Sequence, residues 1–137
     1  MKVSTRSLVM PLTVIMTGLL MAGCAPGLKI TKPVANSTVR SPVEVCFEVT
    51  RVKVEPAKRG VNPGAGHHHI LVDIPQPEDL SLTIPKGEGH IHMGDGSDCK
   101  EIKLSPGLHT LQTIFADGNH VPVKPPLTKA ITIVVKE

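Results

Sequence analysis

Hydrophobic and polar residues alternate with a period of two along most of the chain. Val43, Val45, Phe47 and Val49 alternate with Glu44, Cys46, Glu48 and Thr50, the pattern of a strand with one buried face. Residues 70–74 are hydrophobic on both faces of an extended chain, which favours a central strand. The same pattern predicts strands at residues 28–30, 102–104, 108–116 and 131–135.

Turn-forming residues separate these segments. Pro-Gly, Gly-Asp-Gly, Asp-Gly-Asn and Pro-Pro sequences lie between them, and such combinations mark turns and loops. The chain also contains 13 prolines, which argues against long helices because proline lacks a backbone N–H. About seven short strands with turns between them predict an all-β fold, an immunoglobulin-like antiparallel β-sandwich.

The first 23 residues have the composition of an export signal. Lys2 and Arg6 precede a hydrophobic stretch over residues 8–20 that is too short and wrongly flanked for a transmembrane helix. Met21-Ala22-Gly23-Cys24 resembles the lipobox of bacterial lipoproteins, whose cysteine is lipidated and becomes the mature N-terminus. The alternative is an ordinary signal with an incidental cysteine. We expect a signal peptide over residues 1–23, a lipidated tether over 24–27 and a single domain over 28–137.

Loss of the signal changes the charge balance. It removes two of the 15 basic residues and none of the 12 acidic ones, which leaves a net charge of about +1 with neutral histidines. Nothing in this balance supports a nucleic-acid partner. Ala25 follows the cysteine, and by the usual lipoprotein sorting rule the lack of Asp there favours the outer membrane. We therefore expect a protein anchored by its lipid in the bacterial envelope and facing the periplasm.

Cys46 and Cys99 are the cysteines left after lipidation of Cys24. An oxidising compartment makes a disulfide between them the default expectation. Closure of the intervening 53-residue loop would stabilise the fold by about 4 kcal/mol in the chain-entropy model. The alternative is that Cys99 is a thiolate ligand beside His90 and His92. The order of Cys, His and Met along the chain does not match a blue-copper site.

Five of the seven histidines lie in two short runs, while the chain has no Trp, no Tyr and two Phe. Histidine is the commonest metal ligand, so this composition favours a metal site over stacking on bases or sugars. In an extended strand, alternate residues share one face about 6.6 Å apart. His67 and His69 can therefore converge on one ion while His68 points away, and His90 and His92 have the same spacing. The alternative is that these imidazoles bond backbone carbonyls in glycine-rich loops.

Two further histidines and three aspartates could support such a site. His120 lies in a loop and is the predicted fifth ligand, whereas His109 follows a tight turn and has the pattern of a corner residue bonded to backbone. Carboxylates commonly orient metal-bound histidines through their second ring nitrogen. Asp73, Asp95 and Asp117 are the candidates for that role, with turn capping as the alternative.

Four sequence blocks resemble an exported bacterial family classified only as a domain of unknown function. The blocks are Gly66–Asp73, His90–Gly96, Pro106–Gln112 and Phe115–Pro122 with Pro125-Pro126. They follow the family's order over about residues 30–135. The resemblance implies a periplasmic or surface β-domain whose repeated histidines suggest a metal site, and it implies no established reaction. The two cysteines of the expected disulfide are not part of the family's pattern.

Three classes of function remain open. The first is a lipoprotein that binds copper or zinc as a buffer, chaperone or sensor. The second is a metalloenzyme with an open coordination position, although the histidines lack the full ligand series of copper–zinc superoxide dismutase. The third is an envelope adaptor whose histidines are structural or sense pH. Imidazole suits both metals, and we favour copper because Cu(II) is bound more tightly than Zn in the Irving–Williams order.

Overall fold

The computed structural model describes residues 23–137, so the predicted signal peptide lies outside the described residues except for Gly23. Two sheets pack against each other. The smaller sheet has the strand order β1 (Gly27–Lys32), β3 (Val43–Thr50) and β7 (Cys99–Ile102). The larger sheet has the order β2 (Thr38–Arg40), β9 (Thr128–Lys136), β8 (Gly107–Ala116), β5 (Ala65–Val72) and β4 (Lys53–Val54), and β6 (His90–His92) also pairs with β5.

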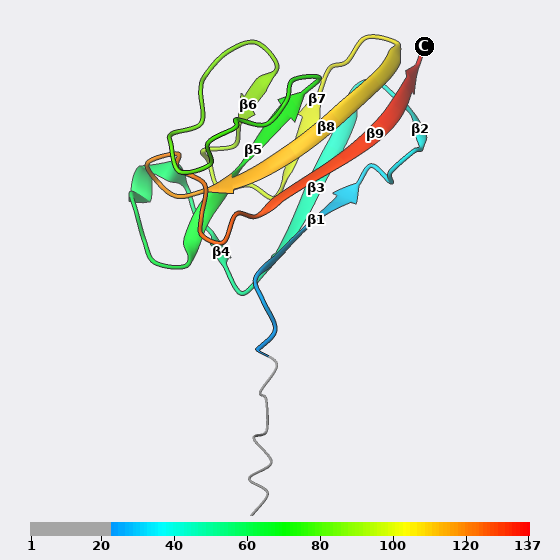
Figure 1. Cartoon of the computed structure of the whole chain (residues 1–137). Coiled ribbons are helices and arrows are strands. Elements are labelled where there is room, and N and C mark those ends of the chain that lie inside the picture. Colours follow the sequence, from blue (N-terminus) through cyan, green and yellow to red (C-terminus); the bar gives the residue numbers. More distant parts are fainter. Residues whose placement is uncertain (1–22) are drawn as a thin grey trace, which may run out of the picture.

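Figure 1 shows the long strands β8 and β9 crossing in front of β3 of the smaller sheet. The only helical segment in residues 23–137 is a 3-10 turn at Ala57–Arg59. Nowhere in that range is there a helix with the length and apolar character needed to span a membrane. The structure confirms the predicted all-β sandwich.

The main core lies between the two sheets. Val43, Val45 and Phe47 of β3 are at most 5% exposed and pack in one cluster with Ile70 of β5 and Leu111 of β8. The alternation has the predicted consequence for Val43, Val45 and Phe47, which enter this core, whereas Val49 near the end of β3 is half-buried and lies outside it. Burial of these side chains is the principal stabilising contribution to the fold.

A second, smaller core lies on the outer face of the larger sheet. It contains Leu71 of β5, Ile114 and Ala116 of β8, and Ile84 from the long loop between β5 and β6. Both faces of β5 are therefore covered, as predicted from the hydrophobic residues on both faces at residues 70–74, although β5 ends at Val72, before Asp73. This arrangement provides a buried outer face on which odd-numbered residues of β5 lie.

The disulfide between Cys46 and Cys99 is present and joins β3 to β7 at directly paired positions. It excludes Cys99 as a thiolate ligand, because an oxidised sulfur is not available to a metal. Cys24 is free and exposed, just ahead of β1.

The strands differ from the predicted set in three ways. The strand predicted at residues 102–104 is β7, which runs over Cys99–Ile102 and ends where the prediction begins. The short strands β2, β4 and β6 carry too few alternating positions to be recognised by periodicity, and β2 and β4 pair in parallel with β9 and β5. In addition, β5 begins at Ala65, ahead of the predicted hydrophobic run. The three consecutive histidines thus lie inside a central strand, because β8 pairs with all three on one side and β6 pairs with His69 on the other.

Candidate metal site

The central strand β5 sends its consecutive histidines to opposite faces. His67 and His69 lie on the outer face, and both are 0% exposed. His68 lies on the inner face, where its ring stacks on Phe47 with centroids 4.5 Å apart and meets Phe115 edge-on at 5.1 Å. The period of two therefore separates two candidate ligands from an imidazole packed in the core.

Strand β6 brings the second histidine run beside the first. The antiparallel register pairs His92 with His69 and His90 with Leu71. His67 Nε2 lies 3.0 Å from His69 Nε2 and 3.1 Å from His92 Nε2. Two segments more than 20 residues apart in sequence thus place three ring nitrogens around one point.

His120 completes the group from the loop that follows β8. A turn closes when the His120 backbone N–H donates to the Asp117 carbonyl (2.9 Å), and His120 adopts a positive φ of 64°. Its Nε2 lies 3.2 Å from His92 Nε2. One ligand atom from each of His67, His69, His92 and His120 lies within 4.8 Å of all the others. We call these residues the four-histidine cluster.

The spacing of the four-histidine cluster suits a metal ion. Imidazole nitrogens bind zinc at about 2.0–2.1 Å, so neighbouring ligands of a tetrahedral ion lie about 3.3 Å apart. The observed contacts of 3.0–3.2 Å come close to that value without rearrangement of the backbone. The described residues thus contain a histidine cluster that could hold a metal ion.

Burial favours the neutral form of three of these rings, those of His67, His69 and His92. The pKa of His67 is lowered from 6.5 to about 4, mainly by burial and to a smaller extent by the adjacent His92 and His120, with the charge of Asp117 opposing. Burial also lowers the pKa of His69, with His67 as the next cause. The pKa of His92 is lowered by burial and by His120. The neutral imidazole is the form that binds a metal.

His90 takes a different position from the other four. Its Nε2 lies 2.8 Å from His69 Nδ1, on the side of the His69 ring that points away from His67. If His69 Nε2 is a ligand, His69 Nδ1 carries the proton and donates it to His90 Nε2. Burial lowers the pKa of His90 and His92 lowers it further, against a hydrogen bond to the Pro85 carbonyl. The geometry fits His90 as the group that fixes the tautomer of His69.

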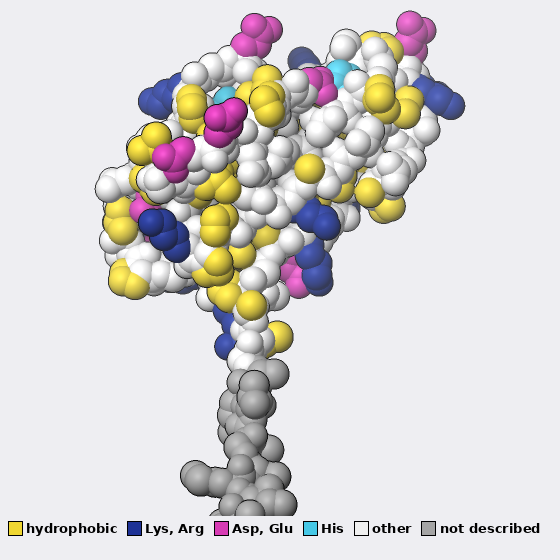
Figure 2. Space-filling model, viewed as in Figure 1, with side chains coloured by type: hydrophobic (Ala, Val, Ile, Leu, Met, Phe, Trp, Pro, Cys, Tyr) yellow, Lys and Arg dark blue, Asp and Glu magenta, His cyan; other side chains and the backbone are white. Residues whose placement is uncertain are grey.

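A cavity of about 400 Å³ lies against one side of the four-histidine cluster. His69, His90, His92 and His120 line it together with Thr83 and Lys86 of the long β5–β6 loop. Thr83 and Lys86 carry no signal in the sequence, because they lie in a loop without periodicity and only the folded loop brings them to the histidines. The cluster is therefore closed by β5 on one side and approachable from the other. On the face of the molecule shown in Figure 2, histidine contributes only small areas of surface.

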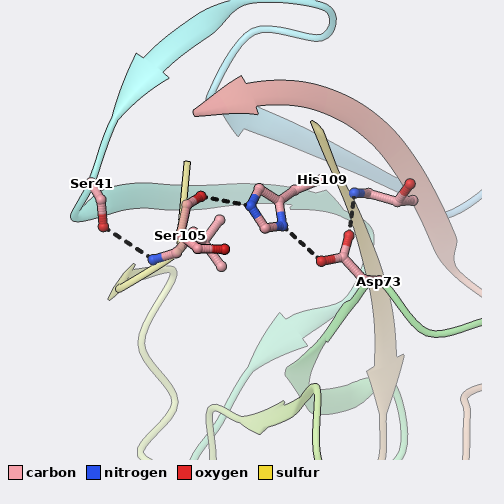
Figure 3. Close-up of polar contacts among 6 residues, drawn as sticks. Ser41, Asp73, Ser105 and His109 are labelled. Atoms are coloured by element: carbon pink, nitrogen blue, oxygen red, sulfur yellow. Dashed lines mark hydrogen bonds and ion pairs between the residues drawn. The ribbon is translucent and has the colours of Figure 1, made fainter. Parts of the chain in front are cut away.

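His109 and Asp73 form a separate polar group at the far end of β5 and β8 (Figure 3). His109 Nδ1 lies 2.7 Å from Asp73 Oδ2, and His109 Nε2 lies 2.8 Å from the Ser105 carbonyl oxygen. Both partners are acceptors, so both ring nitrogens donate and the imidazolium is favoured. The bond to Asp73 is the main cause that raises the pKa of His109, with burial opposing it. Asp73 thus orients His109 and makes no contact with the four-histidine cluster.

The other two candidate aspartates bond to their own turns. Asp95 Oδ1 accepts hydrogen bonds from the backbone N–H and hydroxyl of Ser97 at 3.1 and 2.7 Å. Asp117 Oδ1 accepts from the backbone N–H groups of Asn119 and Val121 at 2.8 and 3.0 Å. Neither carboxylate bonds to a histidine ring, but Asp117 shapes the turn that presents His120.

A family model that covers most of the chain identifies its family. Neither a curated protein nor a solved structure matches the chain. The model of a domain of unknown function, DUF4399, matches residues 45–136, a range that holds every histidine of the sequence. The chain belongs to the DUF4399 family.

Proposed function

We propose that this protein binds one divalent transition metal through Nε2 of His67, His69, His92 and His120. The observation that carries the proposal is the convergence of these four ring nitrogens within 4.8 Å. Three strand positions and one turn, from separate parts of the chain, supply them. His90 contacts the second ring nitrogen of His69 and fixes the tautomer of that ring. Four histidines therefore bind the ion in this proposal, instead of the five predicted from the sequence.

Copper is the preferred ion in this proposal and zinc the next. A ligand set of neutral imidazoles suits both, and the Irving–Williams order places Cu(II) above Zn. In this proposal the protein acts as a metal buffer, chaperone or sensor, roles that need a bound ion but no catalysed reaction. Its place is the bacterial envelope, with Cys24 as the lipid anchor, because this exposed free cysteine precedes β1 by a few residues.

Calorimetric titration of the metal-free mature domain with Cu(II) or Zn tests the site. We expect one ion per chain, and a loss of affinity of at least about 100-fold in the variants His67→Ala and His92→Ala. His90→Ala should lose about 10–100-fold, the range for groups that orient a metal-bound histidine. His68→Leu is the matched control and should bind normally. Absence of binding at neutral pH, or unchanged affinity in the His67→Ala/His92→Ala double variant, would return these histidines to a structural role.

Lipidation needs its own test. In the proposal, the wild-type protein carries acyl mass on Cys24 and partitions with membranes. The variant Cys24→Ala should remain unprocessed or lose the acyl mass in intact-mass spectrometry. The same mass shift in wild type and variant would exclude Cys24 as the anchor.

A metalloenzyme is the second candidate, and the cavity beside the cluster is the observation that favours it. A cavity of about 400 Å³ would admit a small substrate to the ion, as open-coordination metal catalysis requires. Turnover assays on the metal-loaded protein distinguish this function from a buffer or sensor. An adaptor with structural histidines is the outcome if no metal binds.

A further inference from the structure

We propose that the cavity beside the four-histidine cluster binds a small anion, a carboxylate or an inorganic oxyanion, between the metal ion and the ammonium group of Lys86. This inference rests on the proposed metal site and names the ligand class that the site would take. It concerns Thr83 and Lys86, two residues that metal binding itself does not use.

The charge of the lining is the first argument. Four neutral imidazoles leave a divalent ion with its full charge of +2, because no carboxylate or thiolate belongs to the ligand set. Lys86 adds a further positive charge to the same cavity, and none of the lining residues is acidic. Asp95 and Asp117 lie near the histidines, but neither lines the cavity, and Oδ1 of each accepts hydrogen bonds from its own turn. The loaded cavity therefore has an excess of positive charge that attracts an anion.

Access to the ion is the second argument. His67 and His69 are 0% exposed, so solvent cannot reach the cluster from the side on which β5 lies. His92 is exposed and lines the cavity, which leaves this side as the route to the metal. A ligand in the cavity can therefore reach the ion and Lys86 together, with the Thr83 hydroxyl available as a hydrogen-bond donor.

The volume limits the ligand to a small one. A space of about 400 Å³ is near the lower end of the range for small-molecule sites, about 300–1,000 Å³. Such a space exceeds the need of one water, whose share of the liquid is about 30 Å³. It fits a carboxylate or oxyanion of a few heavy atoms and excludes a folded macromolecular partner.

Azide is the probe for this proposal, and Cu(II)-loaded mature protein is the sample. Azide bound to Cu(II) produces a charge-transfer absorption band and changes the electron paramagnetic resonance spectrum. We expect a saturable signal that formate and phosphate compete away. Lys86→Ala should weaken azide binding about three- to tenfold, because a unit charge near a surface site contributes on the order of 1 kcal/mol. Lys103→Ala, an exposed lysine beyond β7, is the matched control and should bind azide as wild type does.

The outcomes separate the two proposals because metal content is measured in every sample. Protein that holds copper but shows no spectral change with azide overturns the anion site and leaves the metal site intact. Equal azide affinity in wild type and Lys86→Ala overturns the role of Lys86. Protein that binds no metal overturns both proposals. Competition by formate but not by phosphate assigns the site to carboxylates, and the reverse assigns it to oxyanions.

Discussion

At the scale of single residues, the histidines differ in protonation because their surroundings differ. His67, His68 and His69 are buried, and burial is the main cause that lowers the pKa values of His67 and His68 to about 4. His109 has an acceptor on each ring nitrogen, so its pKa is raised. One residue type thus supplies candidate metal ligands, a core side chain and a positively charged side chain bonded to Asp73 and Ser105.

His68 should be replaceable without loss of the fold. Both of its ring nitrogens are buried without a hydrogen-bond partner, and the nearest carboxylate, that of Asp98, is 3.9 Å away. His68→Leu fills a similar volume and removes two unsatisfied polar atoms, so we expect a gain of about 1 kcal/mol in the free energy of unfolding at pH 7. Urea denaturation measures it. A marked loss of stability would show that the imidazole makes a polar contact essential to the core.

Asp73 should stabilise the protein more at acidic than at alkaline pH. His109 has a raised pKa, so its stabilising charge is fully present below the unfolded pKa of about 6.5 and is lost as pH rises through the folded value. Asp73→Asn should cost about 1 kcal/mol at pH 6, a modest value because the Asp73 side chain is 47% exposed. The cost should be smaller at pH 9 in urea denaturation. Asp95→Asn is the control without a histidine partner, and its cost should not change over this range.

At the scale of elements, the site depends on how β5, β6 and the turn at His120 are held. The outer-face position of His67 and His69 comes from the register of β5 with β8. His92 depends on the three-residue strand β6, which has no stability of its own and requires β5 as its partner. Contacts that fix β6 should therefore control metal affinity.

Gly94 should be needed for the position of His92. A Cβ built on Gly94 would collide with the His92 ring, and the backbone of Gly94 is otherwise compatible with alanine. Gly94→Ala should displace that ring and lower metal affinity about tenfold, an effect of the size seen when groups supporting a ligand are changed, while the fold persists. Calorimetry measures the affinity. Gly87→Ala is the control because a Cβ there meets nothing within 4 Å; equal affinities in the two variants would contradict the steric argument.

The disulfide should stabilise the sandwich without contributing to the site. Cys46 and Cys99 join β3 to β7 in the smaller sheet across a separation of 53 residues, whereas the cluster lies on the outer face of the larger sheet. The double variant Cys46→Ala/Cys99→Ala should lose up to about 4 kcal/mol in the free energy of unfolding. Metal affinity at a temperature where it remains folded should be unchanged. Cys24→Ala is the control, and loss of metal binding by the folded double variant would show that the two sheets are coupled.

At the scale of the whole molecule, stability depends on pH through the buried histidines. Between pH 6.5 and about 4, His67 and His68 are protonated in the unfolded chain but stay neutral in the metal-free folded protein. The unfolded state binds more protons, so stability falls as pH drops through this window. The lowered pKa of His68 alone corresponds to a loss of about 3 kcal/mol in the free energy of unfolding over this window, since one pKa unit corresponds to about 1.36 kcal/mol.

Metal should raise the stability of the whole domain because it joins β5, β6 and the turn at His120. A ligand at 100 times its dissociation constant stabilises the folded state by about 2.7 kcal/mol. Thermal unfolding at pH 7 should therefore shift upward with Cu(II) or Zn and return to the metal-free midpoint with chelator. His67→Ala should show almost no shift. An equal shift in that variant would place the bound metal elsewhere.

The sequence by itself determined the strands with long alternation and the histidines that could share a face. Val43–Val49 and the spacing of His67 with His69 needed only the period of an extended chain. The oxidising compartment expected from the N-terminal segment indicated the disulfide, and the structure confirms it. These inferences succeeded because they rest on local geometry or on the number of cysteines.

The tertiary structure alone decided which histidines meet and which partners they have. The register of β6 against β5 separates His90 from the four-histidine cluster. The folded β5–β6 loop places Lys86 in the lining of the cavity. Asp73 contacts His109, 36 residues away in sequence, rather than the cluster. No local pattern encodes such contacts, because they depend on how distant segments pack around a common core.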